Sequence, residues 1–141
     1  MPRVHCAAKA IIIDKNKFLV LKYAKGDFSI WDLPGGGIKY GESPDQALIR
    51  EVKEKTKLDI KINKILGVFW FFYHINNDQR VCLTYQCKIT SNNKIDILNN
   101  TDEESNEKFA DYRWITKGEF LSNKDYNNCH VSLKKLISEK L

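Results

Sequence analysis

The chain begins with two apolar segments separated by a short polar turn. Residues 3–13 (RVHCAAKAIII) and 17–24 (KFLVLKYA) are rich in Val, Ile, Leu and Ala, and the polar residues 14–16 (DKN) lie between them. Apolar runs of this length on either side of a polar turn are typical of β-strands. The sequence therefore predicts two strands joined by a turn at the start of the chain.

The pattern becomes helical in residues 43–57 (SPDQALIREVKEKTK). Ser43 is placed as the N-cap, Pro44 suits the first helical position, and Gln46 completes a capping box. Placing successive residues 100° apart separates two faces. The apolar face holds Leu48, Ile49, Val52 and Thr56, and the charged face holds Arg50, Glu51, Glu54 and Lys55. We expect the first face to pack and the second to meet solvent.

The rest of the chain predicts further strands and two more helices. The expected strands cover residues 58–62, 65–75, 80–89 and 110–116, with a turn at 76–79 and a polar loop at 91–108. A short helix is expected after Thr116, and an amphipathic helix over residues 129–140. This order predicts an α/β (α+β) fold, a mixed β-sheet with helices on its faces. No repeat or linker divides the chain, so residues 1–141 are expected to form one domain.

Composition narrows the class of partner. The 141 residues carry 23 basic and 18 acidic side chains, a net charge of +5, which suits an anionic partner such as a nucleotide. No arginine-rich run or basic stripe with interleaved aromatics is present, so polymeric nucleic acid is not expected as a partner. The N-terminal apolar run is broken by Lys9 and Asp14 and resembles neither a signal peptide nor a membrane span. We expect a cytoplasmic protein without a membrane partner.

Four cysteines occur without a CxxC pair, at Cys6, Cys82, Cys87 and Cys129. Cys82 and Cys87 are an odd number of residues apart, so on one strand they would face opposite ways. Reduced thiols in the cytoplasm are the expected state. A less favoured alternative is a zinc site formed by the adjacent His-Cys and Cys-His pairs at residues 5–6 and 129–130.

Chemistry is indicated where the helix meets residues 33–42 (LPGGGIKYGE), which hold four of the seven glycines. Glu51 and Glu54 are three residues apart, so their carboxylates point the same way and form a hard-oxygen site for Mg²⁺ or Mn²⁺. Glycines allow the backbone to approach such a site closely. With Lys39 as a further cation, this is what a pyrophosphate needs, because its transfer chemistry is mostly charge neutralisation and positioning.

The same helix face also has a simpler interpretation. Charged residues outside an amphipathic helix usually form a solvated surface, and Arg50–Glu54 and Glu51–Lys55 are favourable i,i+4 ion pairs. Each pair would contribute roughly 0.2–0.5 kcal/mol. From the helix alone, this simpler interpretation is favoured.

The spacing of the glycine, glutamate and arginine residues between positions 36 and 58 favours a functional site over a plain solvated surface. It resembles the signature of the Nudix hydrolases (the MutT family), G-x5-E-x7-R-E-U-x-E-E-x-G-U, with U a bulky aliphatic residue. The matching positions are Gly36, Glu42, Arg50, Glu51, Val52, Glu54 and Leu58. The flanking segments WDLPGGGI and DYRWIT are also typical of the family, and the resemblance covers roughly residues 4–121.

The resemblance implies the Nudix fold, a mixed sheet sandwiched between helices, and the hydrolysis of a nucleoside diphosphate linked to another group X. Divalent cations would be held by Glu54, by Glu51, which can instead assist the attacking water, and by the carbonyl of Gly36. Arg50 would orient the glutamates, and Glu42 would brace the turn into the helix and add to the acidic site. The implied cofactor is Mg²⁺, with Mn²⁺ as an alternative.

Further site residues are expected outside this helix. The family often supplies another acid from a loop before the last strand, for which Glu107 is the first choice and Glu104 the second, with plain loop solvation as the alternative. The expected substrate contacts are Lys39, Gly37, Trp31 and Tyr85. Residues 69–73 (FWFFY) could stack on a base, but half of these side chains must face inward on a strand.

Two signature positions differ, because Lys55 replaces the second glutamate of the pair and Lys57 replaces the glycine. Lys57 is tolerable at a helix end, where it can interact with the last carbonyls. Lys55 exchanges an anion for a cation and leaves three outcomes: a one-metal enzyme, a lysine that replaces a metal by contacting phosphate, or a fold that binds without cleaving. A working hydrolase on a small nucleotide-derived diphosphate, as a monomer or homodimer, is favoured. A nucleotide-sensing or protein-interaction module is the alternative, and a member acting on RNA 5′ ends is disfavoured.

Overall fold

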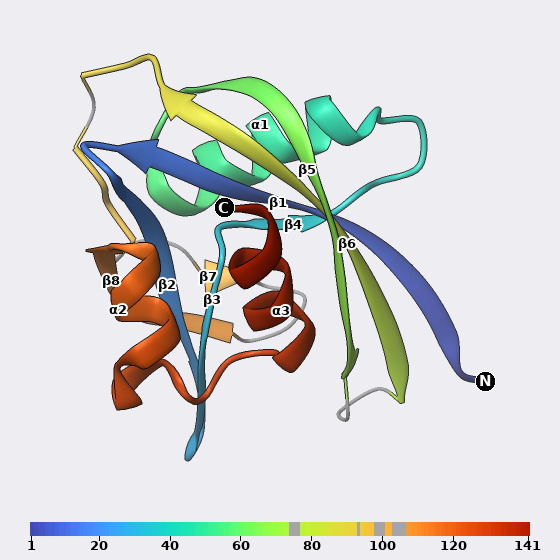
Figure 1. The fold of residues 1–141 in the computed structure, drawn as a ribbon. Helices are drawn as coiled ribbons and strands as arrows, with labels where there is room; N and C mark the ends of the chain where they lie inside the picture. The colour runs from blue at the N-terminus through green and yellow to red at the C-terminus, as the bar shows by residue number, and fades with distance from the viewer. Residues whose placement is uncertain (74–76, 93, 98–100, 103–106) are drawn as a thin grey trace.

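The structure is a computed structural model that describes residues 1–73, 77–92, 94–97, 101–102 and 107–141 (Figure 1). The strands within these residues are β1 (Arg3–Asp14), β2 (Lys17–Lys25), β3 (Phe28–Asp32), β4 (Gly35–Gly37), β5 (Ile60–Tyr73), β6 (Asp78–Ile89), β7 (Thr101–Asp102) and β8 (Glu107–Ile115). The helices are α1 (Pro44–Thr56), α2 (Lys117–Ser122), the 3₁₀ turn η1 (Lys124–Tyr126) and α3 (Val131–Lys140). None of the described helices is long and apolar enough to cross a membrane.

The described strands form one mixed sheet in the order β5-β6-β1-β2-β8-β7, with β3 paired to β2 and β4 to β1. β1 and β6 run parallel over ten residue pairs, from Arg3 opposite Asp78 to Ile12 opposite Cys87, whereas the other pairs are antiparallel. The fold is therefore α+β with a mixed sheet, as the sequence predicted.

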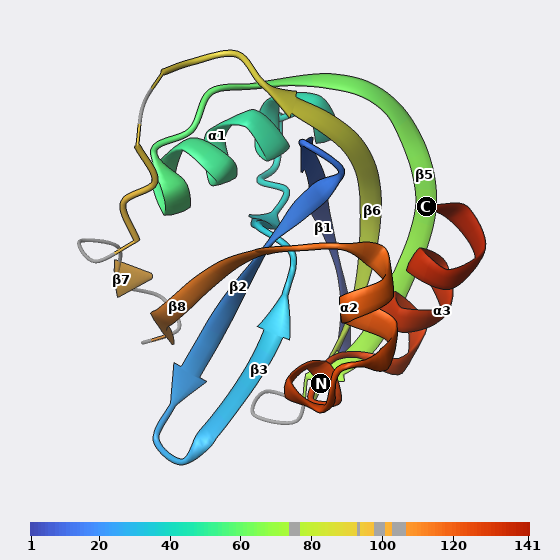
Figure 2. The same ribbon diagram turned by 60° about the vertical axis from the view of Figure 1, so that its left-hand side comes forward.

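Helices cover both faces of this sheet (Figure 2). Along β1, Ala7 and Ile11 belong to a core cluster that includes residues of α2 and α3. Ala8, Ala10 and Ile12 alternate with them and belong to a second cluster that includes residues of α1. Because neighbouring strand residues point to opposite faces, one strand contributes to both cores. The predicted sandwich is confirmed.

The same alternation accounts for two other predictions. Cys82 is buried in the α2–α3 cluster and Cys87 in the α1 cluster, so they face opposite ways on β6, and all four cysteines carry free thiols. On β5, Phe69 is fully buried, whereas Trp70 and Phe72 are exposed. Their rings meet edge to face with centroids 5.5 Å apart. The expected division of this aromatic segment between core and surface is confirmed.

The structure differs from the predicted elements in three places. The two strands expected at 58–62 and 65–75 are one strand, β5, because two irregularities in its pairing with β6 allow the pairing to continue. β3 and β4 were not predicted as strands. β4 consists only of glycines, whose strand propensity is low, and its pairing with β1 sets its conformation. The predicted loop at 91–108 contains β7 and the start of β8, and the turn expected at 76–79 lies partly outside the described residues.

The predicted start of α1 is confirmed, with Ser43 and Gln46 forming both hydrogen bonds of the capping box. The predicted faces need two corrections. Ile49 was expected to pack but is 44% exposed, whereas Lys55 was expected to face solvent but is 9% exposed. The buried stripe is rotated because Ala47 and Lys55, and not Ile49, lie against the rest of the molecule.

The end of α1 provides a stability prediction. Lys57 has the left-handed conformation (φ 67°), and its side chain donates to the carbonyl of Glu54 at 3.1 Å. Glycine adopts this conformation without strain, so Lys57→Gly is expected to stabilise the fold by about 1 kcal/mol, raising the melting temperature by about 2–4 °C. Lys53→Gly, inside the helix, should instead destabilise by about 1 kcal/mol. A Lys57→Gly variant that melts below the wild type would refute this account of the helix end.

Candidate active site at the glycine-rich strand and helix α1

Two glycines of β4 let the backbone lie close to its neighbours. Gly35 has φ 144°, and a Cβ there would lie 2.1 Å from the carbonyl oxygen of Ala8 in β1. A Cβ on Gly36 would lie 2.5 Å from the carboxylate of Glu51. Any larger residue would therefore separate β4 from β1 or displace the glutamate. The glycines place the backbone directly against an α1 carboxylate.

Arg50 joins the loop to the helix. Its Nε and Nη2 donate to the two carboxylate oxygens of Glu42 at 2.7 and 2.8 Å, and Nη2 also donates to the carbonyl of Gly37 at 3.2 Å. The Lys39 backbone N–H donates to Glu42 as well, at 2.9 Å. Hydrogen bonds from Arg50, and then from Lys39, lower the pKa of Glu42 to about 2. Glu42 is therefore an ionised brace at the turn into α1.

Arg50 also brings the two predicted metal-binding carboxylates together. Its Nη1 lies 2.9 Å from Oε1 of Glu51 and 3.4 Å from Oε2 of Glu54. Glu51 is largely buried beside Gly36, whereas the side chain of Glu54 is 53% exposed. The two carboxylates meet at one guanidinium, with one turned inward and the other toward solvent.

Lys55 lies on the inner side of this group. Its Nζ donates to the carbonyl of Gly35 at 2.5 Å and lies 3.5 Å from Oε2 of Glu51. The same ammonium is 5.7 Å from the ring centroids of both Tyr23 and Phe109. Oxygen atoms and aromatic faces both stabilise a positive charge. A cation is thus built into the interior of the site.

The residues present fit a divalent cation on one side of the site only. Both oxygens of Glu51 already face cations, Arg50 and Lys55, and Lys55 also takes the carbonyl of Gly35. No three His, Cys, Asp or Glu side chains gather as a ligand group among the residues that the structure describes. Glu54 is the carboxylate that faces solvent, and Glu51 is the more deeply buried of the two. Hard carboxylate oxygens of this kind suit Mg²⁺ or Mn²⁺.

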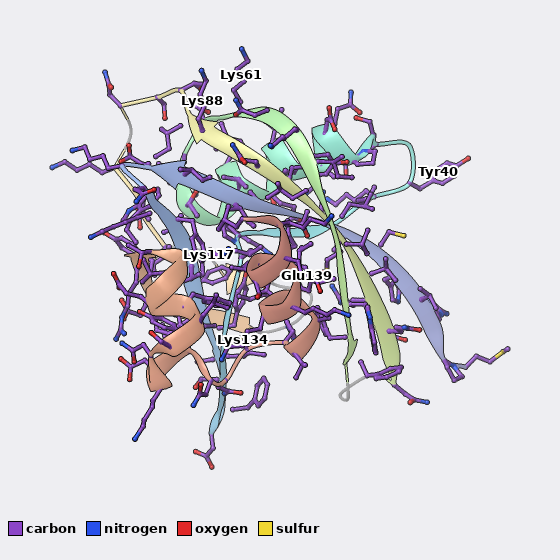
Figure 3. The ribbon with its side chains drawn as sticks, in the orientation of Figure 1. Tyr40, Lys61, Lys88, Lys117, Lys134 and Glu139 are labelled. Carbon is purple, nitrogen blue, oxygen red and sulfur yellow. The ribbon has the colours of Figure 1, made fainter. Side chains whose placement is uncertain are left out.

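The expected substrate contacts in the loop are near this group. Lys39 is exposed between β4 and α1, and its neighbour Tyr40 projects from this loop into solvent (Figure 3). Gly37 contributes its carbonyl to Arg50. This part of the loop therefore combines a surface lysine with a backbone carbonyl that accepts a hydrogen bond from Arg50.

The two predicted aromatic contacts lie on opposite faces of the sheet. Trp31 is buried in the α2–α3 cluster, where its ring meets Tyr126 edge to face at 5.5 Å and Arg113 stacks on it at 4.9 Å. The structure does not bring Trp31 to the α1 face. Tyr85, half-buried on β6, packs against the α1 cluster, and burial, followed by the charge of Asp45, raises its pKa. Tyr85 therefore lies on the same side of the sheet as α1.

The two loop acids predicted for the site belong to the segment that leads from β7 into β8. Glu104 lies outside the described residues. For Glu107 the structure describes the backbone, which pairs with Asp102 at the start of β8, but not the side chain. The carboxylate expected from this segment stays a prediction.

A buried ion pair near the loop was missed in the sequence. Lys9 Nζ lies 3.2 Å from Oδ2 of Asp32 and donates to the carbonyl of Leu33 at 3.3 Å, and His130 of the C-terminal segment lies 3.5 Å from the same carboxylate oxygen. Burial would raise the pKa of Asp32, but the charge of Lys9 and hydrogen bonding to His130 hold it below its usual range. The pair fixes the residues that lead into β4. The sequence did contain an indication of this burial. Lys9 is two residues from the buried Ala7, so both side chains point to the same face of the strand.

The histidines of the alternative zinc pairs contact different carboxylates. His5 lies 3.2 Å from Asp78, and His130 lies 3.5 Å from Asp32 while stacking on Phe71 with centroids 3.7 Å apart. Each histidine is therefore accounted for by its own contacts, and the structure lends no support to a shared zinc site.

Two curated proteins are similar in sequence to part of this chain. A "MutT-like protein" from Streptomyces ambofaciens is 28% identical over 89 residues, covering 62% of this chain and 54% of that protein. An "ADP-ribose pyrophosphatase" from Methanocaldococcus jannaschii is 39% identical over 64 residues, covering 45% of this chain and 38% of that protein. The chain thus spans about half the length, or less, of these curated relatives.

The fold has a close structural counterpart. The MutT protein from Methanosarcina mazei Go1 superposes with a TM-score of 0.76 at 18% identity, covering 96% of this chain and 91% of that one. At that identity the likeness shows the fold. The NUDIX domain family itself matches residues 3–136, which include every described residue of the arginine-centred site. This chain belongs to the NUDIX domain family.

Proposed function

We propose that this protein hydrolyses the pyrophosphate linkage of a small nucleoside diphosphate derivative in a reaction that needs Mg²⁺ or Mn²⁺. The observation that carries the proposal is the arrangement around Arg50, which holds Glu42, Glu51 and Glu54 on one guanidinium against the glycine backbone of β4. A set of charged residues spread over a solvated helix face would not need this fixed geometry.

Each residue has a distinct proposed role. Glu54, with Glu51 behind it, would hold the divalent cation, which when bound neutralises charge on the bridging phosphates. Arg50 positions both carboxylates. Lys39 would meet a phosphate from the loop, because it is an exposed cation beside the brace formed by Glu42. We also propose that the segment near Glu107 supplies a further acid.

The identity of the substrate class rests on the relatives. The name of the Methanocaldococcus protein identifies it as a pyrophosphatase of ADP-ribose, a nucleoside diphosphate linked to a further sugar. Its match to this chain supports a substrate in which a nucleoside diphosphate carries another group. The net charge of +5 is compatible with such an anion. We propose cytoplasmic action on a small molecule, with residues 1–141 acting as one domain.

A second candidate is a module that binds a nucleotide without cleaving it. The observation favouring it is that both oxygens of Glu51 are paired with cations, Arg50 and Lys55. This module would bind nucleotides with little dependence on divalent metal.

A substrate panel separates the two candidates. The protein is incubated with nucleoside triphosphates, nucleotide sugars, ADP-ribose and dinucleoside polyphosphates, with Mg²⁺, with Mn²⁺ and with EDTA, and the products are separated by ion-exchange chromatography. The proposal predicts metal-dependent cleavage at a pyrophosphate bridge in at least one class. Binding by calorimetry without cleavage of any compound would favour the binding module and contradict the enzyme.

A further inference from the structure

Lys55 occupies a position in which oxygen atoms converge from two different elements. The carbonyl of Gly35 in β4 and the carboxylate of Glu51 in α1 both face its Nζ, at 2.5 and 3.5 Å. A main-chain carbonyl together with a carboxylate is the kind of hard-oxygen set that binds a divalent cation. In this chain an ammonium group is present there.

The ammonium is also held firmly in place. Lys55 is 9% exposed, and the faces of Tyr23 and Phe109 flank its Nζ on other sides. It lies in the last turn of α1 and is one of the buried residues of that helix. A buried, multiply contacted ammonium does not exchange with solvent ions, because its charge is covalently attached to the chain.

Glu51 is consequently neutralised from two sides. Oε1 pairs with Arg50 at 2.9 Å and Oε2 with Lys55 at 3.5 Å, and Gly36 lies so close that a Cβ there would contact the carboxylate. A divalent cation placed between Gly35 and Glu51 would meet the ammonium at contact distance. At such a separation like charges repel each other, and the repulsion is stronger where water is excluded.

We propose that Lys55 is an intrinsic cation that takes the place of an inner divalent metal ion, so that this protein binds one exchangeable divalent cation, at Glu54. The inference rests on the proposed metal requirement for that exchangeable ion, but the role of Lys55 is independent of catalysis. Lys55 is a positioning residue: it holds the carbonyl of Gly35 and the carboxylate of Glu51 in the arrangement that a metal would otherwise impose.

Manganese binding tests this directly. Purified wild type, Lys55→Glu and Lys53→Glu are titrated with Mn²⁺, and free Mn²⁺ is measured by electron paramagnetic resonance. Lys53→Glu is the matched control, because it makes the same charge change on the same helix at an exposed residue that pairs with Asp59 at 2.9 Å. We expect one bound Mn²⁺ in the wild type and in Lys53→Glu, and two in Lys55→Glu. The dissociation constant of the second Mn²⁺ in Lys55→Glu should be at least roughly tenfold below that of any second Mn²⁺ bound by the wild type.

Two results would overturn the inference: a wild type that already binds two ions tightly, or a Lys55→Glu variant that binds no more than the wild type. A wild type that binds none, with one gained in Lys55→Glu, would support the role given to Lys55 but contradict the single site at Glu54 and, with it, the proposed metal requirement. Should Lys55→Glu fail to fold without metal, Lys55→Met answers the same question, since it removes the ammonium without adding a charge. A gain of one Mn²⁺ in Lys55→Met supports the inference, and no gain refutes it.

Discussion

Asp32→Asn is expected to destabilise the fold by about 3–5 kcal/mol, because it leaves the charge of Lys9 buried without its counter-ion. Both side chains are buried, and the pair lies 3.2 Å apart. The loss should appear in urea unfolding as a lower midpoint with an unchanged slope. Replacing both partners together, as Lys9→Met with Asp32→Leu, should recover much of the loss, since the uncompensated charge is then gone.

The matched control is the exposed pair between Lys53 and Asp59, where Asp59→Asn should cost less than about 1 kcal/mol. The wild type should also lose stability in acid. Because the folded pKa of Asp32 lies below its ordinary value of 3.8, its contribution is complete above that value and is lost as the pH falls below it. Asp32→Asn should lack this part of the acid dependence. A cost below 1 kcal/mol for Asp32→Asn would contradict the role given to the pair.

Arg50→Lys is expected to lower the rate of pyrophosphate hydrolysis by about 100-fold, because lysine keeps the charge but cannot bridge the same partners. Arg50 contacts Glu42, Glu51, Glu54 and the carbonyl of Gly37 with its three nitrogens. One ammonium cannot hold these groups in register. We expect the loss in kcat on the best substrate of the panel, since the carboxylates would be misplaced and not removed.

Two comparisons show whether the effect of Arg50→Lys is local. Lys53→Gln, on the outer surface of the same helix, should retain nearly full turnover. The circular dichroism spectrum and the melting temperature of Arg50→Lys should show a folded protein. If Arg50→Lys kept more than half of the wild-type kcat, the guanidinium would not be what positions the site.

Local sequence signals predicted much of the fold because the information they carry is local. The start of α1 follows from Ser43, Pro44 and Gln46, which satisfy the first helical N–H groups whatever surrounds them. The opposite burial of Cys82 and Cys87 follows from strand geometry alone. The resemblance to Nudix hydrolases then led correctly to the family and to the mixed sheet between helices.

The features that were missed depend on contacts distant in the sequence. β4 is a strand because β1 pairs with it, and three glycines show no strand preference of their own. Lys55 has a charged side chain at a position that helical periodicity places on the outer face. It is buried because the carbonyl of Gly35 and the rings of Tyr23 and Phe109 surround it. Such compensation of a buried charge becomes visible only in three dimensions.

If the carboxylates gathered by Arg50 support metal-dependent cleavage of a pyrophosphate, turnover must depend on both Mg²⁺ and Glu54. The most direct measurement is steady-state turnover of the best panel compound over a range of Mg²⁺ concentrations, for wild type and Glu54→Gln side by side. We expect turnover that saturates with Mg²⁺ in the wild type and falls by at least about 100-fold in Glu54→Gln, which stays folded because Glu54 is half exposed. Equal turnover in the two proteins, or none in either, would refute the proposed metal-dependent hydrolysis.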